Sequence, residues 1–516
     1  MTIPLCKSYL PLLLAASLLS SCLDVEPESA IPQREAMQTA DDADQVLLGI
    51  YAGLKGAALF SGLLTQLPDL QSDFVYAVDG FSNTYGNIWQ WDIRPTTTET
   101  ESIYGALYNV ISRCNFYLDC IDGVLARETD DEELEVLETS TGEVHCIRAL
   151  CYSKLIECFC KAYDPATAAE EPGVVLRTKF FTSEPIRRAS LADSYAFVLD
   201  ELALAEKMID PDYDTPCYAL MSHAAAEALH ARVALYMQNW DDAIAYATKV
   251  IDNDRFTLTD ATRHTYSATV NDFRYLWSDD LGSEAIWRIG FTTTSYGGAL
   301  GSIFLGFSRD YTYYYPDYVP AQSVLDLYGA SDLRASSYFA SELPVGYAYG
   351  LDWPLIVKYM GNRQLMAVNI YEVNMPKPFR LAEQYLIRAE ALCRKPQPDY
   401  AGAGRDLTAL RLKRGCGSLT VNERDWLKNI SDERVRELYM EGFRLNDLKR
   451  WGKAYADAVG DGTWSIVRSR QANSLAEGSE LKVRWDDPLF VWPIPQSEID
   501  APGADIAPND SNGRKN

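Results

Sequence analysis

Apolar side chains recur every three to four residues along much of the chain, and this spacing places them on one face of an α-helix. The stripe in residues 41–59 is an example: Ala43, Val46, Leu47, Ile50, Tyr51 and Leu54. The same periodicity predicts helices at residues 41–59, 101–121, 132–162, 191–209, 221–237, 241–251, 379–393 and 405–414. Because an apolar stripe must be buried against a neighbouring element, we expect a mainly α fold.

The predicted helices follow one another in pairs. The join at residues 239–243, Asn-Trp-Asp-Asp-Ala, is similar to the corner of a tetratricopeptide repeat, where an aromatic side chain fills the gap between two antiparallel helices. A single pair cannot bury its apolar face alone, so stacked pairs share one core. The pattern predicts a tetratricopeptide-like α-helical scaffold of about four helix pairs, separated by long insertions.

Residues 256–378 do not keep this periodicity. They contain Gly297-Gly298, several prolines and short β-like runs such as residues 285–289, with one short helix predicted at 324–328. We expect a loop-rich, partly β subdomain inserted into the scaffold, because loops on a rigid frame are where binding residues concentrate. The predicted organisation is a signal peptide at 1–21, N-terminal helices at 22–255, the variable subdomain at 256–378, and C-terminal helices with a tail at 379–516.

Residues 431–452 combine a helical pattern with many charges. We predict one helix that begins at Ser431 or Asp432 and ends at Gly452. Four charged residues share one face of that helix: Glu437, Glu441, Arg444 and Asp447. Two carboxylates one turn apart could act as general acid and base, or the four groups could form a half-buried ion network. Each acid has an Arg nearby, which lowers a carboxyl pKa, and this favours the network.

The first 21 residues have the pattern of a secretory signal, with one Lys near the start and an apolar core at residues 9–19. They end in Leu-Ser-Ser followed by Cys22, which resembles the lipobox of bacterial lipoproteins. This resemblance implies that Cys22 is acylated and anchors the chain to a membrane. Acidic residues at 24, 26 and 28 resemble the surface-export signal of Bacteroidetes lipoproteins. We therefore expect the protein to be lipid-anchored in the outer membrane and to face the exterior.

The composition narrows the possible ligands. The formal net charge is −26, which repels phosphate backbones and makes nucleic acid an unfavourable partner. The chain has 32 Tyr, 11 Trp and 17 Phe, and the Tyr content exceeds what a core alone needs. Tyrosine presents an apolar ring and a polar hydroxyl, so this excess indicates a polar-aromatic binding surface.

The segment from Asp79 to Trp91, DGFSNTYGNIWQW, lies between the first two predicted helices. Its rings and amides could serve a sugar, whose C–H face stacks on a ring and whose hydroxyls need fixed polar partners. The candidate ligand-binding residues of this segment are Asn83, Tyr85, Trp89 and Trp91. The alternative is that the two tryptophans are core anchors of an irregular segment.

A second aromatic segment runs from Tyr296 to Tyr318. Side chains on an extended strand alternate between its two faces, so Tyr313, Tyr314 and Tyr315 cannot all point into one core. We take Tyr296, Tyr313 and Tyr314 as candidate ligand-binding residues. The alternatives are an ordinary subdomain surface and a contact with a partner protein.

Motifs of several enzyme classes are missing from the sequence. No CxxC pair, GxGxxG, GxSxG or Walker loop occurs, and the four His are scattered, so we expect no cofactor and no metal site. Four acids could in principle include a glycosidase pair: Asp272, Asp279, Asp280 and Glu284. Nothing in their spacing specifies the carboxylate separation that glycoside hydrolysis requires, so we do not expect an enzyme.

The charged segment also resembles a long family signature, ER-x-x-EL-x-x-EG-x-R-x-x-DL-x-RWG, which residues 433–452 match. Three other segments resemble further parts of the same family: Arg148-Ala149-Leu150, Arg388-Ala389-Glu390-Ala391, and Trp492-Pro493-Ile494-Pro495 with Glu498. The family is the SusD/RagB-like family of outer-membrane nutrient-binding lipoproteins, and the matches keep its order along nearly the whole chain after Cys22.

This resemblance implies a non-catalytic cell-surface protein that binds a glycan and delivers it to a SusC-like TonB-dependent transporter. It also implies that the segment near residues 79–91 contributes to the ligand face. Three alternatives stay open: a family member that captures peptides, a scaffold that binds only proteins, and a secreted glycoside hydrolase. The resemblance does not specify which glycan is bound.

Overall fold

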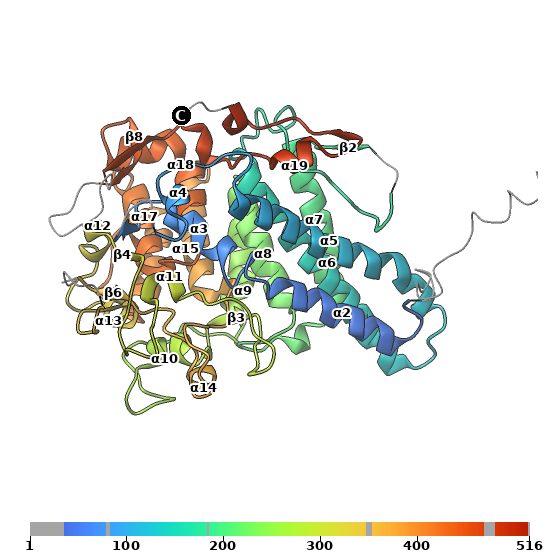
Figure 1. Ribbon diagram of the computed structural model, residues 1–516, viewed down its shortest axis with the longest axis horizontal. Coiled ribbons are helices and arrows are strands. Elements are labelled where there is room, and N and C mark those ends of the chain that lie inside the picture. The colour runs from blue at the N-terminus through green and yellow to red at the C-terminus, as the bar shows by residue number, and fades with distance from the viewer. Residues whose placement is uncertain (1–35, 79–82, 183–184, 347–352, 469–479, 514–516) are drawn as a thin grey trace, which may run out of the picture.

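The computed structural model describes residues 36–78, 83–182, 185–346, 353–468 and 480–513 (Figure 1). The predicted signal peptide and Cys22 lie outside these residues, as do residues 79–82 of the first aromatic segment. Signal cleavage and acylation of Cys22 therefore stay predictions, and so do the domain boundaries.

Eight longer helices correspond to the eight that the periodicity predicts. They are α2 (Ala40–Leu54), α5 (Thr98–Leu125), α6 (Asp131–Phe159), α7 (Leu191–Met208), α8 (His223–Tyr236), α9 (Trp240–Asp252), α15 (Leu381–Arg394) and α16 (Tyr400–Leu412). Consecutive helices pack as the pairs α2–α5, α6–α7, α8–α9 and α15–α16, and α5–α6, α7–α8 and α9–α15 join the pairs into one array (Figure 1). The prediction of a mainly α, tetratricopeptide-like scaffold is confirmed.

Local sequence explains where these helices begin. Thr39 forms a capping box with Asp42 at the start of α2, in which each side chain accepts a backbone N–H of the other residue. The side chains of Ser190, Ser222 and Asn239 cap α7, α8 and α9 in the same position. Capping satisfies N–H groups that the first helical turn leaves without partners.

The remaining elements are short. The helices are α3 (Leu63–Leu70), α4 (Gly86–Trp89), α10 (Asp272–Ser278), α11 (Ser302–Leu305), α12 (Gln322–Leu325), α13 (Arg334–Tyr338), α14 (Arg363–Met366), α19 (Gln496–Ile499), η3 (Pro211–Tyr213), η4 (Pro488–Phe490) and η5 (Asp510–Gly513). The two-stranded sheets are β1 (Val75–Ala77) with β4 (Tyr318–Pro320), β2 (Ile186–Arg187) with β10 (Ala504–Asp505), β3 (Ala285–Trp287) with β7 (Phe379–Arg380), β5 (Phe339–Ala340) with β6 (Leu355–Ile356), and β8 (Trp464–Arg468) with β9 (Leu481–Arg484). In Figure 1, α10, α11, α13 and α14 lie lower than α15, and α12 lies at the left above β4.

The prediction of one helix over residues 431–452 is wrong. The structure has two helices, α17 (Trp426–Leu438) and α18 (Arg444–Val459), with a break that contains Met440 at φ 59° and Gly442 at φ 84°. Asp69 on α3 stabilises the break, because its carboxylate accepts the backbone N–H groups of Gly442 at 2.9 Å and Arg444 at 2.8 Å. Gly452 does not end a helix; it is a kink within α18 at φ 50°.

The charges of this segment are buried in ion pairs, as the favoured interpretation expected, but Glu437, Glu441, Arg444 and Asp447 pair with other residues and not with one another. The carboxylate of Glu437 contacts three guanidinium groups: Arg334 at 3.0 Å, Arg380 at 2.9 Å and Arg414 at 2.9 Å. Burial alone would raise the pKa of Glu437, but these cations, Arg414 foremost, hold it well below its usual range. A carboxyl group so strongly ionised is unsuited to donating a proton, so a general-acid role is excluded for it.

The network also connects α17 to the region between residues 256 and 378. Arg380 and Arg414 both bind Glu284, at 2.6 Å and 2.8 Å, and Arg334 binds Glu433 at 2.7 Å. Hereafter the Glu437 network means Glu284, Arg334, Arg380, Arg414, Glu433 and Glu437, all of which are buried. It joins residues that lie far apart in the sequence and so fixes how the insertion sits on the scaffold.

Removing the central carboxylate should destabilise the protein strongly. In Glu437→Gln three buried guanidinium groups lose an anionic partner, and breaking a buried ion pair costs about 3–5 kcal/mol of unfolding free energy. Asp457→Asn is the matched control, because the Lys453–Asp457 pair is 58% and 52% exposed and should contribute less than about 1 kcal/mol. Denaturant unfolding measures both variants, and equal effects would contradict the assignment.

Glu143 on α6 should make stability fall as the pH rises from about 4.5 to about 8. Its carboxyl accepts the hydroxyl of Tyr51, and burial raises its pKa from 4.5 to about 8. The folded state therefore holds this proton more tightly than the unfolded state, and the resulting stability is complete below pH 4.5 and lost as the pH rises through about 8. The slope is at most about 1.4 kcal/mol per pH unit.

Thermal unfolding between pH 5 and 9 tests the role of Glu143 by comparing the variants Glu143→Gln and Glu138→Gln. Glu143→Gln should flatten the loss of stability between pH 5 and 8, because glutamine keeps an acceptor for Tyr51 but cannot ionise. Glu138 is exposed on the same helix, so Glu138→Gln should retain the wild-type slope. Identical pH profiles for the two variants would show that Glu143 does not titrate in this range.

Candidate ligand-binding face

The two aromatic segments singled out in the sequence lie side by side. Strand β1, just before the first segment, pairs antiparallel with β4, at the end of the second, with Tyr76 opposite Val319. The Asn83 amide donates to the Asp317 carboxylate at 2.8 Å across 234 sequence positions, and the Tyr318 hydroxyl donates to the Thr84 carbonyl at 2.6 Å. Main-chain pairing and side-chain hydrogen bonds therefore hold the segments together.

Trp89 and Trp91 do not lie on this surface. Their relative exposures are 0% and 4%, and their indole N–H groups donate to the carbonyls of Val75 at 3.1 Å and Gln71 at 2.7 Å. Trp89 ends the short helix α4, and Trp91 follows it, with its ring packed edge-on against Phe490. In this structure neither ring is available for stacking on a ligand, which matches the alternative of core anchors.

Asn83 is buried and Tyr85 is partly buried. Asn83 is 8% exposed and is held by Asp317, while Tyr85 is half-buried at φ 60°, and burial raises the pKa of its hydroxyl. Their contact with a ligand stays a prediction.

The second segment carries a cluster of exposed rings. Tyr311, Tyr313 and Tyr315 are 69%, 44% and 38% exposed, whereas Tyr314 between them is half-buried. This alternation is the one expected for consecutive tyrosines. Tyr314 packs on Phe307, and Phe307 packs on Tyr371, each with ring centroids 5.1 Å apart. We call these residues the aromatic face: Phe307, Tyr311, Tyr313, Tyr314, Tyr315 and Tyr371.

Backbone hydrogen bonds hold the aromatic face in place. Tyr314 donates to Pro344 at 2.9 Å and accepts from Gly346 at 3.0 Å, and Ser308 donates to Tyr313 at 2.9 Å. Beneath the rings, the Glu372 carboxylate accepts the Phe307 N–H at 2.7 Å. Burial raises the pKa of Glu372, and that hydrogen bond offsets part of the rise.

The backbone around the aromatic face is strained. Thr312 and Glu372 have φ of 57° and 62°, a region that residues other than glycine rarely adopt. Tyr85 on the neighbouring segment has φ 60°. Such conformations cost of order 1–3 kcal/mol each and cluster at ligand sites.

Tyr296 is 46% exposed but lies on a different loop. That loop is held against the connection between α2 and α3, because Lys55 donates to Ser295 at 3.3 Å and the Gly298 N–H donates to Ser61 at 2.8 Å. No interaction recorded among the described residues joins Tyr296 to the aromatic face, so its role stays a prediction.

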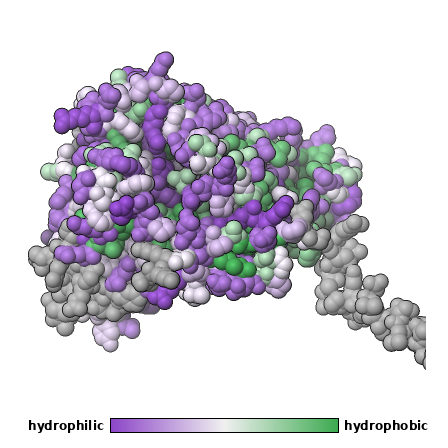
Figure 2. Space-filling model, turned by 90° about the horizontal axis from the view of Figure 1, so that it is seen from above, coloured by the Kyte–Doolittle hydropathy of each residue, from purple (hydrophilic) through white to green (hydrophobic). Residues whose placement is uncertain are grey.

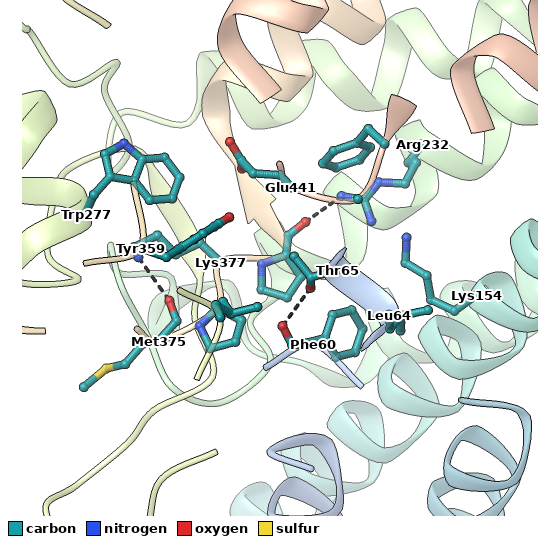
Figure 3. Close-up of a pocket in the computed structure, with 15 residues that line it drawn as sticks. Phe60, Leu64, Thr65, Lys154, Arg232, Trp277, Tyr359, Met375, Lys377 and Glu441 are labelled. Carbon is teal, nitrogen blue, oxygen red and sulfur yellow. Dashed lines mark hydrogen bonds between the residues drawn. The ribbon is translucent and has the colours of Figure 1, made fainter. Parts of the chain in front are cut away.

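Figure 3 shows an interior cavity of about 40 Å³, lined by residues such as Trp277, Tyr359, Lys154, Arg232 and Lys377. Each of its three cations has a carboxylate partner, Glu157, Glu383 and Asp280 respectively, at 2.6 Å. A buried water needs about 10–15 Å³, so the cavity has room for a few water molecules and not for a sugar ring.

A groove of about 350 Å³ runs along α5, and the sequence reasoning missed it. It is lined by residues from α5 and from the segment before β2, among them Tyr108, Arg177 and Phe181. Phe181 is 75% exposed. An aromatic residue within a polar segment was the one sequence feature that could have indicated this groove. Figure 2 shows the side that carries α19, β2 and β8, where hydrophilic residues cover most of the surface and hydrophobic ones form separate patches.

The carboxylates considered for a hydrolase are all engaged. Asp280 binds Lys377 at 2.6 Å, Glu284 binds two arginines of the Glu437 network, and Asp279 binds Arg363 at 2.7 Å. The fourth, Asp272, accepts the Thr265 N–H at 2.6 Å.

The described ranges contain no group of three His, Cys, Asp or Glu that could hold a metal ion. In the same ranges no helix has the length and apolar character needed to cross a bilayer.

Two family profiles match the chain. One, described as "SusD family", matches residues 352–504, and the other, described as "Starch-binding associating with outer membrane", matches residues 22–235.

Individual proteins similar to this chain carry SusD-like names as well. SusD-like protein P38 of Formosa agariphila is 22% identical over 86% of this chain and 90% of its own. Starch-binding protein SusD of Bacteroides thetaiotaomicron is 42% identical over 76 residues, 14% of this chain and 12% of its own.

Among solved structures, a SusD superfamily protein from Bacteroides vulgatus superposes with a TM-score of 0.75, at 23% identity, over 93% of this chain and 100% of its own. A laminarin-binding SusD-like protein superposes with a TM-score of 0.66, at 21% identity, over 92% and 99%. At these identities the likeness establishes the fold.

The assignment of Trp89 to the core and of Tyr313 to the surface predicts opposite effects on stability. Trp89→Ala should lower the free energy of unfolding by about 3–5 kcal/mol, because it leaves a large cavity. Tyr313→Ala should change it by about 0.5 kcal/mol or less, as surface substitutions do. Thermal and denaturant unfolding measure both, and an unchanged Tm in Trp89→Ala would contradict the buried position.

Proposed function

Because the chain belongs to the SusD/RagB-like family, we propose that it binds a glycan on the aromatic face and delivers it to a SusC-like TonB-dependent outer-membrane transporter. The protein itself breaks no bond in this proposal; it captures and presents the ligand. Acylated Cys22 would hold it in the outer membrane with the aromatic face toward the exterior. Two acyl chains or more anchor stably, where one does not.

The observation that carries the proposal is the set of exposed, fixed rings on the aromatic face. A sugar ring offers an apolar C–H face, which gains from contact with an aromatic ring, and hydroxyls, which need hydrogen-bond partners. The aromatic face supplies exposed tyrosine rings, whose hydroxyls can serve as such partners. An extended surface of this kind suits a chain of sugars, because several rings can contact successive units.

The relatives support a glycan as the ligand class without identifying it. One relative is named for starch and one structural neighbour for laminarin, so similar folds carry different glycans. The engaged state of Asp272, Asp279, Asp280 and Glu284 supports a non-catalytic role, because glycoside hydrolysis needs two carboxyl groups free to reach the substrate.

Binding to soluble polysaccharides tests the proposal. The purified protein should be retarded in native gels that contain its glycan, within a panel that includes starch and laminarin, and no new reducing ends should form. In the double variant Tyr311→Ala/Tyr313→Ala the affinity should fall at least about tenfold, equivalent to about 1.4 kcal/mol. Tyr213→Ala is the matched control, because Tyr213 on η3 is 45% exposed and Tyr313 is 44% exposed.

Each other outcome points to a different function. Wild-type affinity in the double variant would remove the aromatic face from the site. Steady release of reducing ends would make the protein a hydrolase, and binding of peptides with no glycan binding would make it a peptide-capturing family member.

A further inference from the structure

The segments that form the aromatic face carry mostly acidic charges. In residues 307–317, 341–346 and 371–372 there is one cation, Arg309, and the neighbouring residues 83–91 have no ionisable carboxylate or cation. The carboxylates of these segments are Asp310, Asp317, Glu342 and Glu372. Any ligand on the rings therefore lies in a field set by four acids and one base.

No cation neutralises these acids within the described part of the chain. Asp317 takes its hydrogen bonds from the neutral groups Asn83 Nδ2 and Thr84 N, and Glu372 takes one from Phe307 N. Asp310 and Glu342 are exposed and make no ion pair with a described residue. Their charges are consequently open to solvent on the segments that carry the aromatic face.

Two cations on the flanking segments are already paired. Lys358 is buried and donates to Glu441 at 2.6 Å and to the Tyr439 carbonyl at 2.7 Å, whereas Arg363 is 47% exposed and binds Asp279 at 2.7 Å. Lys358 is therefore held away from the aromatic face, and the exposed cations Arg309 and Arg363 are outnumbered by the four carboxylates.

Such a field separates glycans by their charge. A polymer that carries carboxylate or sulfate groups would meet repulsion from the local acids, and a net charge of −26 on the whole chain adds to it at a distance. A neutral polymer meets none, and its hydroxyls can donate to carboxylates in charge-assisted hydrogen bonds, which are stronger than neutral ones. Electrostatics therefore weakens the binding of anionic glycans and strengthens the binding of neutral ones.

We propose that the aromatic face selects neutral glycans over glycans that carry carboxylate or sulfate groups. This inference rests on the proposed function, because it names the ligand class of the same site. Glu372 is the acid most firmly fixed near the rings, because its carboxylate accepts the Phe307 N–H. The Phe307 ring in turn packs on Tyr314 and Tyr371.

Paired polysaccharide probes test the selection on the wild-type protein. Starch and laminarin serve as neutral probes, and polygalacturonate and alginate as polyuronate probes, each at low ionic strength and at about 0.5 M salt. We expect at least one neutral polymer to bind with an affinity that changes less than about twofold with salt, because no net charge is paired. We expect no retention of either polyuronate at low salt.

Charge reversal then tests whether the local acids are responsible. In Asp310→Lys/Glu342→Lys, polygalacturonate should be retained at low salt and released at about 0.5 M salt, where the Debye length falls to a few ångströms. The matched control is Glu135→Lys/Glu138→Lys, which makes the same change in net charge at two exposed positions on α6. The control should bind no polyuronate.

The outcomes separate this inference from the proposed function. Retention of a polyuronate by the wild type would overturn the inference and leave glycan binding intact. Failure of the reversed variant to retain polygalacturonate, or retention by the control as well, would also overturn it. If neither neutral polymers nor polyuronates bind, the proposed function itself fails, provided that circular dichroism shows a folded protein.

Discussion

The position of the binding segments depends on one buried carboxylate, Glu437. Three arginines surround it, and two of them also bind Glu284 from the inserted region. Removing such charges from water is so unfavourable that it is compensated only when every partner is in place. The network therefore fixes the position of α17 relative to the inserted region, and this also fixes the loops that carry the aromatic face.

The break between α17 and α18 serves the same geometry. Tyr439 and Met440 leave the helix there, and their carbonyls accept hydrogen bonds from Lys358 at 2.7 Å and Tyr359 at 2.9 Å. A continuous helix would have used those carbonyls in its own backbone ladder. The buried Asp69 completes the junction by capping α18, and burial raises its pKa to about 7. Scaffold and insertion are thus joined through main-chain groups as well as through charges.

Periodicity predicted the long helices because burial of one apolar stripe dominates their formation; α7, for example, begins at the predicted residue and ends one residue earlier than predicted. The break at Met440 could not be predicted, since it depends on Asp69, which lies far away in the sequence. For Trp89 the sequence left stacking and core packing equally possible, and only the tertiary hydrogen bond to Val75 decides between them. The alternation at Tyr313, Tyr314 and Tyr315 was predictable because it follows from local strand geometry. The groove along α5 combines two distant segments, so no local pattern reveals it.

The proposed glycan site is shallow, so its affinity would depend on how rigidly the aromatic face is held. Each loop or side chain that becomes ordered on binding costs of order 0.5–1.5 kcal/mol, which a few ring contacts could not offset. Here the rings are ordered beforehand, by the β1–β4 pairing, by Glu372 beneath Phe307 and by strained backbone at Thr312. The packed scaffold and the Glu437 network can offset the cost of this strained backbone, because strained conformations persist only where the surrounding structure holds them.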